Sequence, residues 1–399
     1  MNTLAPVSSL KHTETELLSF LVQYSGENES PIAFWRLPNS DIKHLIISEA
    51  FHEIGTADLF EDLGPGFLMA PFDKNKNRFF LPADLFFSFE NGTLKTQSNF
   101  QENTSALWLS EKIQSYIPKN NFNFKSNPPL PSGDNEKDSF IELIGTCLKE
   151  IQRGAFEKIV PSRMKFIELP ETFDIVQSFQ KLCESSPQAL ISFVSIPGVG
   201  SWLGASPEVL VSVEDKTIFK TVALAGTLPY HEGLNIKSVA WTQKEIEEQA
   251  LVERYVISCF KKIRLREYEE RGPKTVIAGN LMHLKSEFTV DMKATNFPQM
   301  GSVMLQLLHP TSAVCGMPLE ASLKFLEQYE GYDRGFYAGY LGPVNVNNDV
   351  DLFVNLRCMQ IFENRAILYA GAGVTIDSIA EEEWAETKIK FDTLLNVIL

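Results

Sequence analysis

The sequence has 399 residues, of which 44% are hydrophobic and 22% are charged, a balance typical of a soluble globular protein. This length fits one large domain or two ordinary ones. The formal net charge of −15 argues against nucleic acid or an anionic membrane surface as a partner, but it does not exclude a small anionic ligand, whose binding depends on local charge.

The lack of a recognisable targeting signal and the pattern of cysteines favour a cytoplasmic protein. No apolar run reaches the roughly 20 residues needed to span a bilayer, so no membrane partner is expected. The first 20 residues lack the basic and apolar regions of a secretory signal. Five scattered cysteines without CxxC spacing predict reduced thiols: Cys147, Cys183, Cys259, Cys315 and Cys358.

The N-terminal part, residues 1–117, carries several short apolar segments typical of strands. They are IAFWRL (32–37), HLIIS (44–48), GFLMAPF (66–72) and ADLFFSF (83–89). The following residues, 118–139, are polar and rich in Pro, Asn and Ser, which predicts a linker or a long surface loop.

Helices and strands then alternate irregularly. Helices are expected near 137–153, 236–263, 296–308, 318–329 and from 379 onward. Strands are expected at 158–169, 189–196, 208–214, 217–224, 339–346, 351–362 and 366–373. Asn347–Asp349 and Glu363–Asn364 occupy positions where hairpin turns are expected.

Because strands arrive in hairpins and helices arrive separately, the pattern predicts an α+β fold with mainly antiparallel sheets. Two packed sheets flanked by helices would use strands from both sides of 118–139. That segment would then be a loop within a single domain covering 1–399, with the motifs described below in 140–399.

One candidate carboxylate lies on the helix around TQKEIEEQALVERYVISCF (242–260). At about 100° per residue, Glu248 shares a side with Leu251, Val252, Tyr255 and Val256, the apolar stripe that would face inward. A carboxylate on that side needs a partner. The alternative is an edge position that reaches solvent.

The last helix repeats this arrangement. Its buried stripe is Phe391, Leu394, Leu395 and Ile398, and the preceding turns place four polar residues in the same sector: Glu383, Glu386, Thr387 and Lys390. Carboxylates near a helix N-terminus are also favoured by the helix dipole, which is the structural alternative. For Glu381 and Glu382 this alternative is preferred.

Two carboxylates from different helices suit Mg²⁺, which takes oxygen ligands and shares its coordination sphere with water and an anionic substrate. The six histidines are too far apart in sequence for zinc spacing: His12, His44, His52, His231, His283 and His309.

Glycines recur in the segments AGT (225–227), GYLG (339–342) and AGAG (370–373). Backbone without a Cβ can approach an anion closely, although strand ends and bulges also use glycine. None of these segments matches a nucleotide-binding loop.

Three further charged residues lie within or at the start of apolar segments that are expected to be strands. Arg357 lies in the alternating segment 351–361, where a central strand would require a carboxylate partner from a substrate or from the protein. Lys158 and Glu208 each begin an apolar strand, so burial could lower the pKa of the lysine, although most such lysines are simply solvated.

Several blocks in their order along the chain resemble the chorismate-utilising enzymes. The blocks are HPTSAVCGMP (309–318), EGYDRGFYAGYLG (330–342), LRCMQI (356–361), YAGAG (369–373) and EEEWAETKIK (381–390). The resemblance extends from about Phe156 to the C-terminus, and it implies one large α+β domain with two antiparallel sheets layered between helices.

The resemblance also implies roles for individual residues. Glu248 and Glu386 match the two Mg²⁺-binding glutamates of the family, and Glu383 matches a nearby helper that acts through water. The substrate-binding positions of the family match Gly226, Thr227, His283, Arg357, Gly371, Gly373 and Lys390. Gln249 departs from the pattern, since many members have His there, and Ala223 stands where several have Pro.

Within the family, HPTSAVCG is similar to the isochorismate synthase pattern, with Ala313 and Val314 shaping the pocket wall. Ala225 stands where aminodeoxychorismate synthases have a nucleophilic Lys, and Gly316–Leu319 differs from the GAPK-type sequence of anthranilate synthases. Lys158 matches the base that activates water in the isochorismate synthase subgroup.

The resemblance therefore implies Mg²⁺-dependent conversion of chorismate to isochorismate, with Lys158 as the base for water attack at C2. Glu208 is expected to protonate the C4 hydroxyl as it leaves, which requires a raised carboxyl pKa. We expect a cytoplasmic monomer without a glutamine amidotransferase subunit, serving menaquinone or siderophore synthesis.

Three alternatives remain at this point. A salicylate synthase would go on to eliminate pyruvate in the same pocket. An ammonia-dependent enzyme such as anthranilate synthase would give an aromatic amine, against which Lys158 argues. A non-catalytic relative would only bind a carboxylate ligand, against which the combination of Lys158, Glu208, Glu248 and Glu386 argues.

Overall fold

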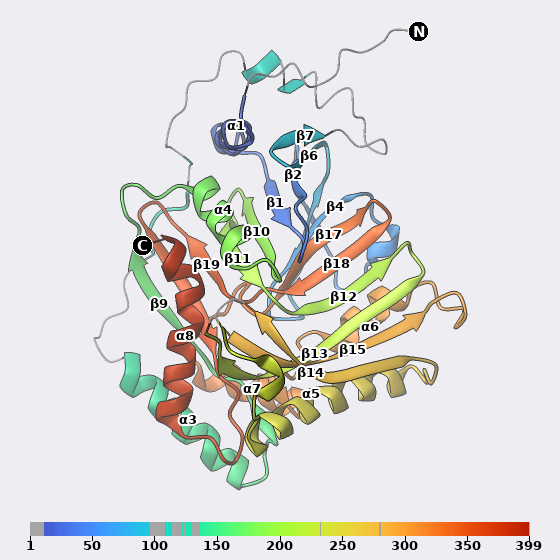
Figure 1. Ribbon diagram of the computed structural model, residues 1–399, viewed down its shortest axis with the longest axis vertical. Helices are drawn as coiled ribbons and strands as arrows, with labels where there is room; N and C mark the ends of the chain where they lie inside the picture. The colour runs from blue at the N-terminus through green and yellow to red at the C-terminus, as the bar shows by residue number, and fades with distance from the viewer. Residues whose placement is uncertain are drawn as a thin grey trace.

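The protein is described by a computed structural model covering residues 12–95, 108–109, 111–113, 122, 124–128, 136–231, 233–278 and 281–398. Within these residues the chain forms two large antiparallel sheets that share one hydrophobic core and have helices on their outer faces (Figure 1). This arrangement confirms the expected α+β fold.

Each large sheet has nine strands in the described part of the chain. The first sheet runs, in spatial order, β7 (Thr93–Lys95), β6 (Leu85–Glu90), β2 (Lys43–Ile47), β1 (Ile32–Arg36), β10 (Leu190–Ile196), β11 (Gly200–Ser206), β19 (Cys358–Ile361), β20 (Arg365–Gly371) and β9 (Ser162–Glu168). The second runs β14 (Glu269–Ala278), β15 (Leu281–Asp291), β13 (Ile218–Pro229), β12 (Val209–Glu214), β18 (Asp349–Val354), β17 (Tyr340–Val346), β4 (Gly66–Ala70), β5 (Arg78–Pro82) and β3 (His52–Ile54). A short pair, β8 (Lys158–Ile159) and β16 (Gly316–Met317), lies apart from both sheets.

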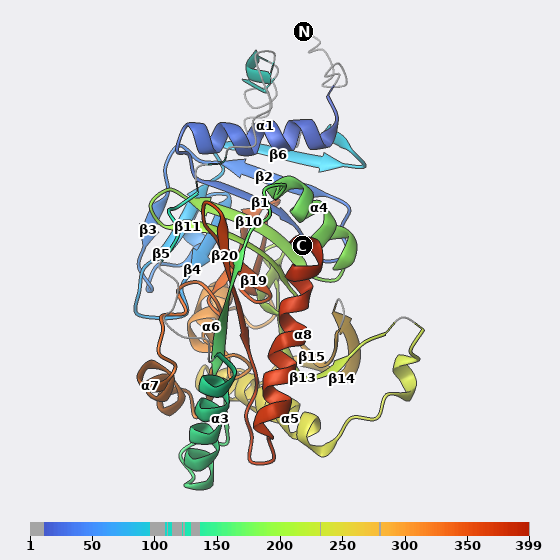
Figure 2. The ribbon, with the colours of Figure 1, turned by 90° about the vertical axis from the view of Figure 1, so that its left-hand side faces the viewer.

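The strand period of two explains the layers. Along β1, Ala33 and Trp35 belong to the core between the sheets, whereas Phe34 faces the other side and stacks on Phe179, with ring centroids 3.7 Å apart. That outer face is covered by α1 (Glu14–Glu27), α4 (Ile175–Ser185) and α8 (Ala380–Ile398), as Figure 2 shows.

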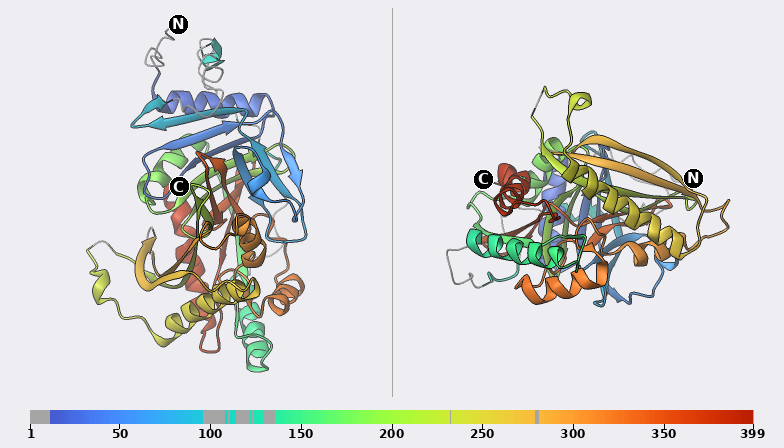
Figure 3. Two further views of the ribbon diagram at one scale, coloured as in Figure 1. Left: turned by 90° about the vertical axis from the view of Figure 1, so that its right-hand side faces the viewer. Right: turned by 90° about the horizontal axis from the view of Figure 1, so that it is seen from below.

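The outer face of the second sheet is covered by α5 (Gln243–Lys262) and α6 (Met300–Leu308). Figure 3 shows α5 running beneath this sheet, with α3 (Glu136–Gln152) near α8. The remaining long helix, α7 (Leu319–Tyr329), packs on β16, and with α3 it forms a separate smaller core. None of the described helices combines the length and the hydropathy that a membrane-spanning helix needs.

The N-terminal part of the chain completes both sheets. β1 pairs with β10, where Phe34 faces Phe193, and β4 pairs with β17, where Leu68 faces Gly342. The loop expected at 118–139 lies mostly outside the described residues, and α3 already begins at Glu136 within that range.

Three expected elements differ from the structure. The segment 158–169 is divided, because Lys158 and Ile159 pair with β16 as β8, whereas β9 begins at Ser162 in the first sheet. The segment 351–362 is not one strand, because β18 ends at Val354 in the second sheet and β19 begins at Cys358 in the first. Arg357 lies between them with φ +47, a left-handed conformation that interrupts a strand. The helix expected from Ile236 begins only at Gln243, because Thr242 and Glu245 form a capping box there.

Candidate active site

The candidate site lies where the chain passes twice between the two sheets. β11 of the first sheet leads to β12 of the second through Glu208, and β18 returns to β19 through Arg357. The two crossings are joined by backbone hydrogen bonds, since Val354 N donates to Glu208 O at 3.0 Å and Ala205 N donates to Arg357 O at 3.0 Å. The fold therefore holds a carboxyl and a guanidinium close together.

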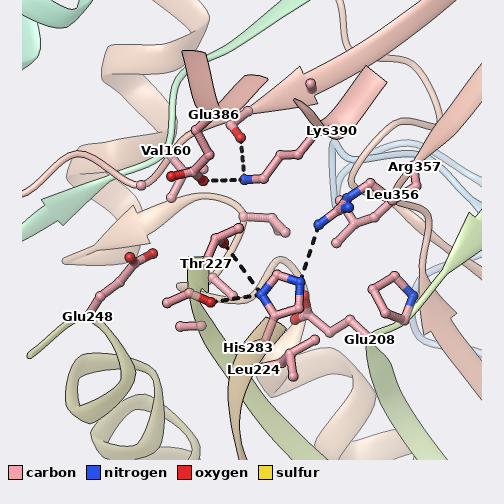
Figure 4. Close-up of a pocket in the computed structure, with 18 of the residues that line it drawn as sticks. Val160, Glu208, Leu224, Thr227, Glu248, His283, Leu356, Arg357, Glu386 and Lys390 are labelled. Carbon is pink, nitrogen blue, oxygen red and sulfur yellow. Dashed lines mark hydrogen bonds and ion pairs between the residues drawn. The ribbon is translucent and has the colours of Figure 1, made fainter. Parts of the chain in front are cut away.

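A pocket with about 650 Å³ of empty space, including its solvent-filled mouth, opens at these crossings (Figure 4). All the predicted site residues except Lys158 and Glu383 line it. They are Glu208, Gly226, Thr227, Glu248, His283, Ala313, Val314, Arg357, Gly371, Gly373, Glu386 and Lys390. Residues from distant parts of the sequence thus converge on one cavity.

Glu208 is almost fully buried, with 3% of its surface exposed. Burial raises the pKa of its carboxyl to about 7, although the nearby Lys158 charge and a hydrogen bond from Thr311 act in the opposite direction. Thr311 Oγ1 donates to Glu208 Oε1 at 3.4 Å. The raised pKa matches the sequence-based expectation for this residue and allows the carboxyl to hold a proton near neutral pH.

His283 connects the glycine segment to Arg357. The β13–β15 register shifts between Ala225 and Leu228, which indicates a bulge at Gly226, whose φ is +66. The bulge directs Gly226 O toward His283 Nδ1 at 2.8 Å, and since a carbonyl only accepts, Nδ1 carries the proton. His283 Nε2 then accepts from Arg357 at 3.4 Å.

Burial dominates the electrostatics of this pair. It lowers the pKa of His283 to about 3, with help from the Arg357 charge, so the imidazole is neutral at physiological pH. Burial also lowers the pKa of Arg357 to about 10, which still leaves the guanidinium charged. The structure records no ion pair for Arg357 with a carboxylate among the described residues, so its charge is available to an anionic ligand.

Glu386 and Lys390 lie one turn apart on α8. Lys390 Nζ is 2.6 Å from Glu386 Oε1 and donates to Gly371 O at 2.7 Å, which ties the helix to the end of β20. Burial alone would raise the pKa of Glu386, but the Lys390 ammonium holds it below its ordinary value. Glu386 is therefore a carboxylate at neutral pH.

Glu248 faces the pocket from α5, on the opposite side from Glu208 in Figure 4. Its Oε1 lies 2.8 Å from Nζ of Lys158, whose side chain is completely buried behind the pocket wall. Gly373 makes this arrangement possible, because a Cβ there would collide with Glu248 Oε1 and lie 3.1 Å from Lys158 Cε.

Glu383 lies outside the pocket and pairs with a residue that the sequence reasoning missed. Its fully buried side chain has Oε1 2.5 Å from Lys244 Nζ. Burial and the charge of Glu386 raise the pKa of Glu383 to about 7. Lys244 is one turn before Glu248 on α5, and this spacing was the sequence signal for it.

The residues present fit a magnesium ion. Two carboxylates, Glu248 and Glu386, border the same pocket, and the buried Oε2 of Glu383 has no hydrogen-bond partner among the residues that the structure describes. Within the part of the chain that the structure describes, no group of three or more His, Cys, Asp or Glu side chains has metal-binding geometry. A cation held here would therefore draw further ligands from water and substrate, as Mg²⁺ usually does.

Part of the pocket wall was not predicted. Tyr337 and Tyr369 line the pocket and stack with ring centroids 5.3 Å apart, and further apolar lining comes from Val160, Leu224 and Leu356. Tyr369 directly precedes AGAG at 370–373, and Tyr337 lies two residues before GYLG at 339–342, so each adjoins a glycine segment that was singled out. Their position beside these glycine segments was the sequence signal that could have identified them as pocket residues.

A family model described as chorismate binding enzyme matches residues 75–399. The chain belongs to this family. The match confirms the resemblance inferred from the motifs, and it covers most of the chain, including the pocket.

Relatives within the family are named as isochorismate synthases. The chain is 27% identical over 267 residues to "Isochorismate synthase EntC" of Escherichia coli, covering 66% of this chain and 67% of that protein. It is 27% identical over 282 residues to "Isochorismate synthase DhbC" of Bacillus subtilis, covering 68% of this chain and 69% of that protein.

Solved structures show the same fold. The Bacillus anthracis protein described as a 2,3-dihydroxybenzoate-specific isochorismate synthase, DhbC, matches with a TM-score of 0.74 at 22% identity, covering 95% of this chain and 99% of that chain. MenF of Escherichia coli, described as a menaquinone-specific isochorismate synthase, matches with a TM-score of 0.74 at 20% identity, covering 100% of this chain and 92% of that chain.

Proposed function

We propose that this enzyme converts chorismate to isochorismate by adding water at C2 and releasing the C4 hydroxyl. The carrying observation is the position of Glu208, a buried carboxyl with a pKa of about 7, across the pocket from Glu248, whose Oε1 lies 2.8 Å from the buried Lys158 Nζ. The names of the relatives support this reaction within a family that acts on chorismate.

Two cationic side chains in the pocket are suited to binding the carboxylates of a dianion. Arg357 and Lys390 provide two cations for carboxylates, and the exposed backbone at Gly371 and Gly373 allows close approach. Tyr337 and Tyr369 supply an apolar wall for the ring. These contacts fix the ring between Glu208 and Glu248.

We propose that Glu248 and Glu386 hold Mg²⁺, with the buried Glu383, paired with Lys244, supporting the site. When bound, the ion neutralises and polarises a substrate carboxylate. This role explains how a chain with a net charge of −15 binds a dianion.

Two proton transfers complete the reaction. Lys158, the proposed general base, takes a proton from the water that attacks C2, and Glu208 gives a proton to the C4 oxygen, which leaves as water. The ring double bonds shift between these carbons. One water enters and one leaves, so the product is an isomer, and proton return from Lys158 to Glu208 through solvent restores the enzyme.

The test is incubation of the purified protein with chorismate and Mg²⁺, followed by chromatography. Isochorismate as the main product, abolished by EDTA and restored by Mg²⁺, is expected. Salicylate with pyruvate would identify a salicylate synthase instead. An aromatic amine formed with added ammonium would identify an ammonia-dependent enzyme.

We also propose that the enzyme acts as a cytoplasmic monomer without an amidotransferase subunit. Because water is the nucleophile in the proposed reaction, no ammonia supply is required. One relative is named as vibriobactin-specific and MenF of Escherichia coli is described as menaquinone-specific, so we propose that the product enters siderophore or menaquinone synthesis. Size-exclusion chromatography coupled to light scattering measures the oligomeric state, and a dimer mass would contradict the monomer proposal.

A further inference from the structure

Arg334, which follows α7, is a buried arginine outside the pocket, with 3% of its surface exposed. Its Nε and one terminal nitrogen donate to the two oxygens of Glu330, each at 2.7 Å. The guanidinium also stacks on Phe72, 4.4 Å from the ring centroid. A buried ion pair is tolerated when its hydrogen bonds are satisfied, and here the planar fork satisfies both oxygens.

The same guanidinium donates to two backbone carbonyls of the pocket wall. One terminal nitrogen donates to Val314 O at 2.8 Å, and the other donates to Val160 O at 2.7 Å. Both Val160 and Val314 line the pocket. Arg334 therefore holds together two wall segments that are more than 150 residues apart in sequence.

These segments carry the proposed proton-transfer residues. Val160 is two residues after Lys158, and Val160 N donates to Cys315 O at 2.9 Å, which joins the same two segments directly. On the other segment, Thr311 contacts Glu208. Glu330 adds a further tie, because Ser162 N donates to its Oε1 at 2.6 Å.

We propose that Arg334, oriented by Glu330, is a positioning residue that sets the distance between the Lys158 segment and the Thr311–Val314 segment. This inference rests on the proposed function, since it names what aligns the base and the acid of that reaction. Arg334 touches no reacting atom, so it acts only through these carbonyls.

Arg334→Lys is the informative substitution, because it keeps the positive charge beside Glu330 but removes the fork that reaches both carbonyls. Arg36→Lys is the matched control. Arg36 is 2% exposed and donates to the carbonyls of Leu37, Cys183, Ser186 and Pro187, none of which lines the pocket.

The measurements are kcat and KM for chorismate, the melting temperature, and hydrogen–deuterium exchange of peptides covering 156–163 and 311–318. Misplaced reacting groups cost up to about 100-fold in rate, so we expect Arg334→Lys to lower kcat between about 10-fold and 100-fold. KM should change less than about threefold, because Arg357 and Lys390 still bind the carboxylates. The two peptides should exchange faster in Arg334→Lys, whereas Arg36→Lys should leave both their exchange and kcat unchanged at a similar loss of melting temperature.

Equal loss of kcat in the two variants, or unchanged exchange in both peptides, would overturn the proposal. If Arg334→Lys does not fold, Glu330→Gln replaces it, with the same expected direction and the same contradicting outcomes. Hydrogen–deuterium exchange is measured without substrate turnover, so its result does not depend on the proposed reaction. Faster exchange in a protein that makes no isochorismate would therefore refute the proposed function while leaving the structural role of Arg334 intact.

Discussion

Lys158 and Glu248 form an ion pair at 2.8 Å in which the lysine is completely buried and the carboxylate borders the pocket. The proposed base and a proposed metal ligand are thus direct neighbours. A metal ion and Lys158 would share Glu248, which couples the two parts of the chemistry at one carboxylate.

This pair predicts an asymmetric response to mutation. Glu248→Ala leaves a buried ammonium without a counter-charge, so we expect a loss of about 3–5 kcal/mol in the free energy of unfolding. Lys158→Met combined with Glu248→Gln removes both charges and should recover most of that stability, although both variants should be inactive. Denaturant unfolding measures the difference, and a loss below about 1 kcal/mol in Glu248→Ala would contradict the pairing.

Glu208→Gln should lower kcat by about 100-fold to 10,000-fold, because it removes a general acid. Wild-type activity should decline as pH rises through about 7, since the acid works in its protonated form and its pKa is about 7. A pH–rate profile checks this assignment. Activity that keeps rising to pH 9 would remove Glu208 from this role.

The same carboxyl has a consequence for stability. Its pKa rises from 4.5 to about 7 on folding, so the folded state binds the proton more tightly and loses stability as pH rises between these values. The cost at pH 8 is on the order of 3 kcal/mol. Glu208→Gln should therefore lose less melting temperature than wild type between pH 5 and pH 8. Identical dependence of the melting temperature on pH in the two proteins would show that burial does not raise the pKa of Glu208.

Gly373→Ala should abolish turnover and also lower the free energy of unfolding, because it breaks the buried Lys158–Glu248 pair. An added Cβ collides with Glu248 Oε1, so the carboxylate must leave its place beside Lys158, while the backbone of Gly373 needs no positive φ. Gly145→Ala in α3 is the control, because no described atom lies within 4 Å of its added Cβ and helix propensity predicts a gain of about 0.5–1 kcal/mol. Wild-type kcat in Gly373→Ala would show that Glu248 has another position available.

Lys244→Met should weaken Mg²⁺ binding by about 10-fold to 100-fold, as loss of a supporting partner does at other metal sites. The ion pair with Glu383 ties α5 to α8 one turn before the two proposed ligands, Glu248 and Glu386. Calorimetric titration with Mg²⁺ alone measures this affinity.

Lys74→Met is the control for that titration, because its pair with Glu320 is largely exposed. Such surface pairs contribute about 0–1 kcal/mol to stability. Unaltered Mg²⁺ affinity in Lys244→Met would limit the Lys244–Glu383 pair to a structural role.

Local sequence patterns predicted the parts of the site that depend on one helix. The 3.6-residue period placed Glu248 and Glu386 on inward faces, and both border the pocket. The strand period failed for Arg357, because its left-handed backbone breaks the alternation and Arg carries no sequence signal for that conformation.

Other contributions were beyond local patterns because they depend on contacts between distant segments. Arg334 reaches Val160 across more than 170 positions, and Lys244 reaches Glu383 across 139. β11 was missed because Gly200 and Gly204 obscure its strand character, and Gly204 is required there because a Cβ would approach Cys358 Cβ to 2.9 Å.

The pairing of β4 with β17 delays completion of the second sheet until late in translation. Residues 66–70 meet their partner only after residues 340–346 have been made, so a growing chain on the ribosome carries an open strand edge through most of translation. Premature termination anywhere between these segments leaves that edge exposed to other chains, which makes truncated products prone to aggregate.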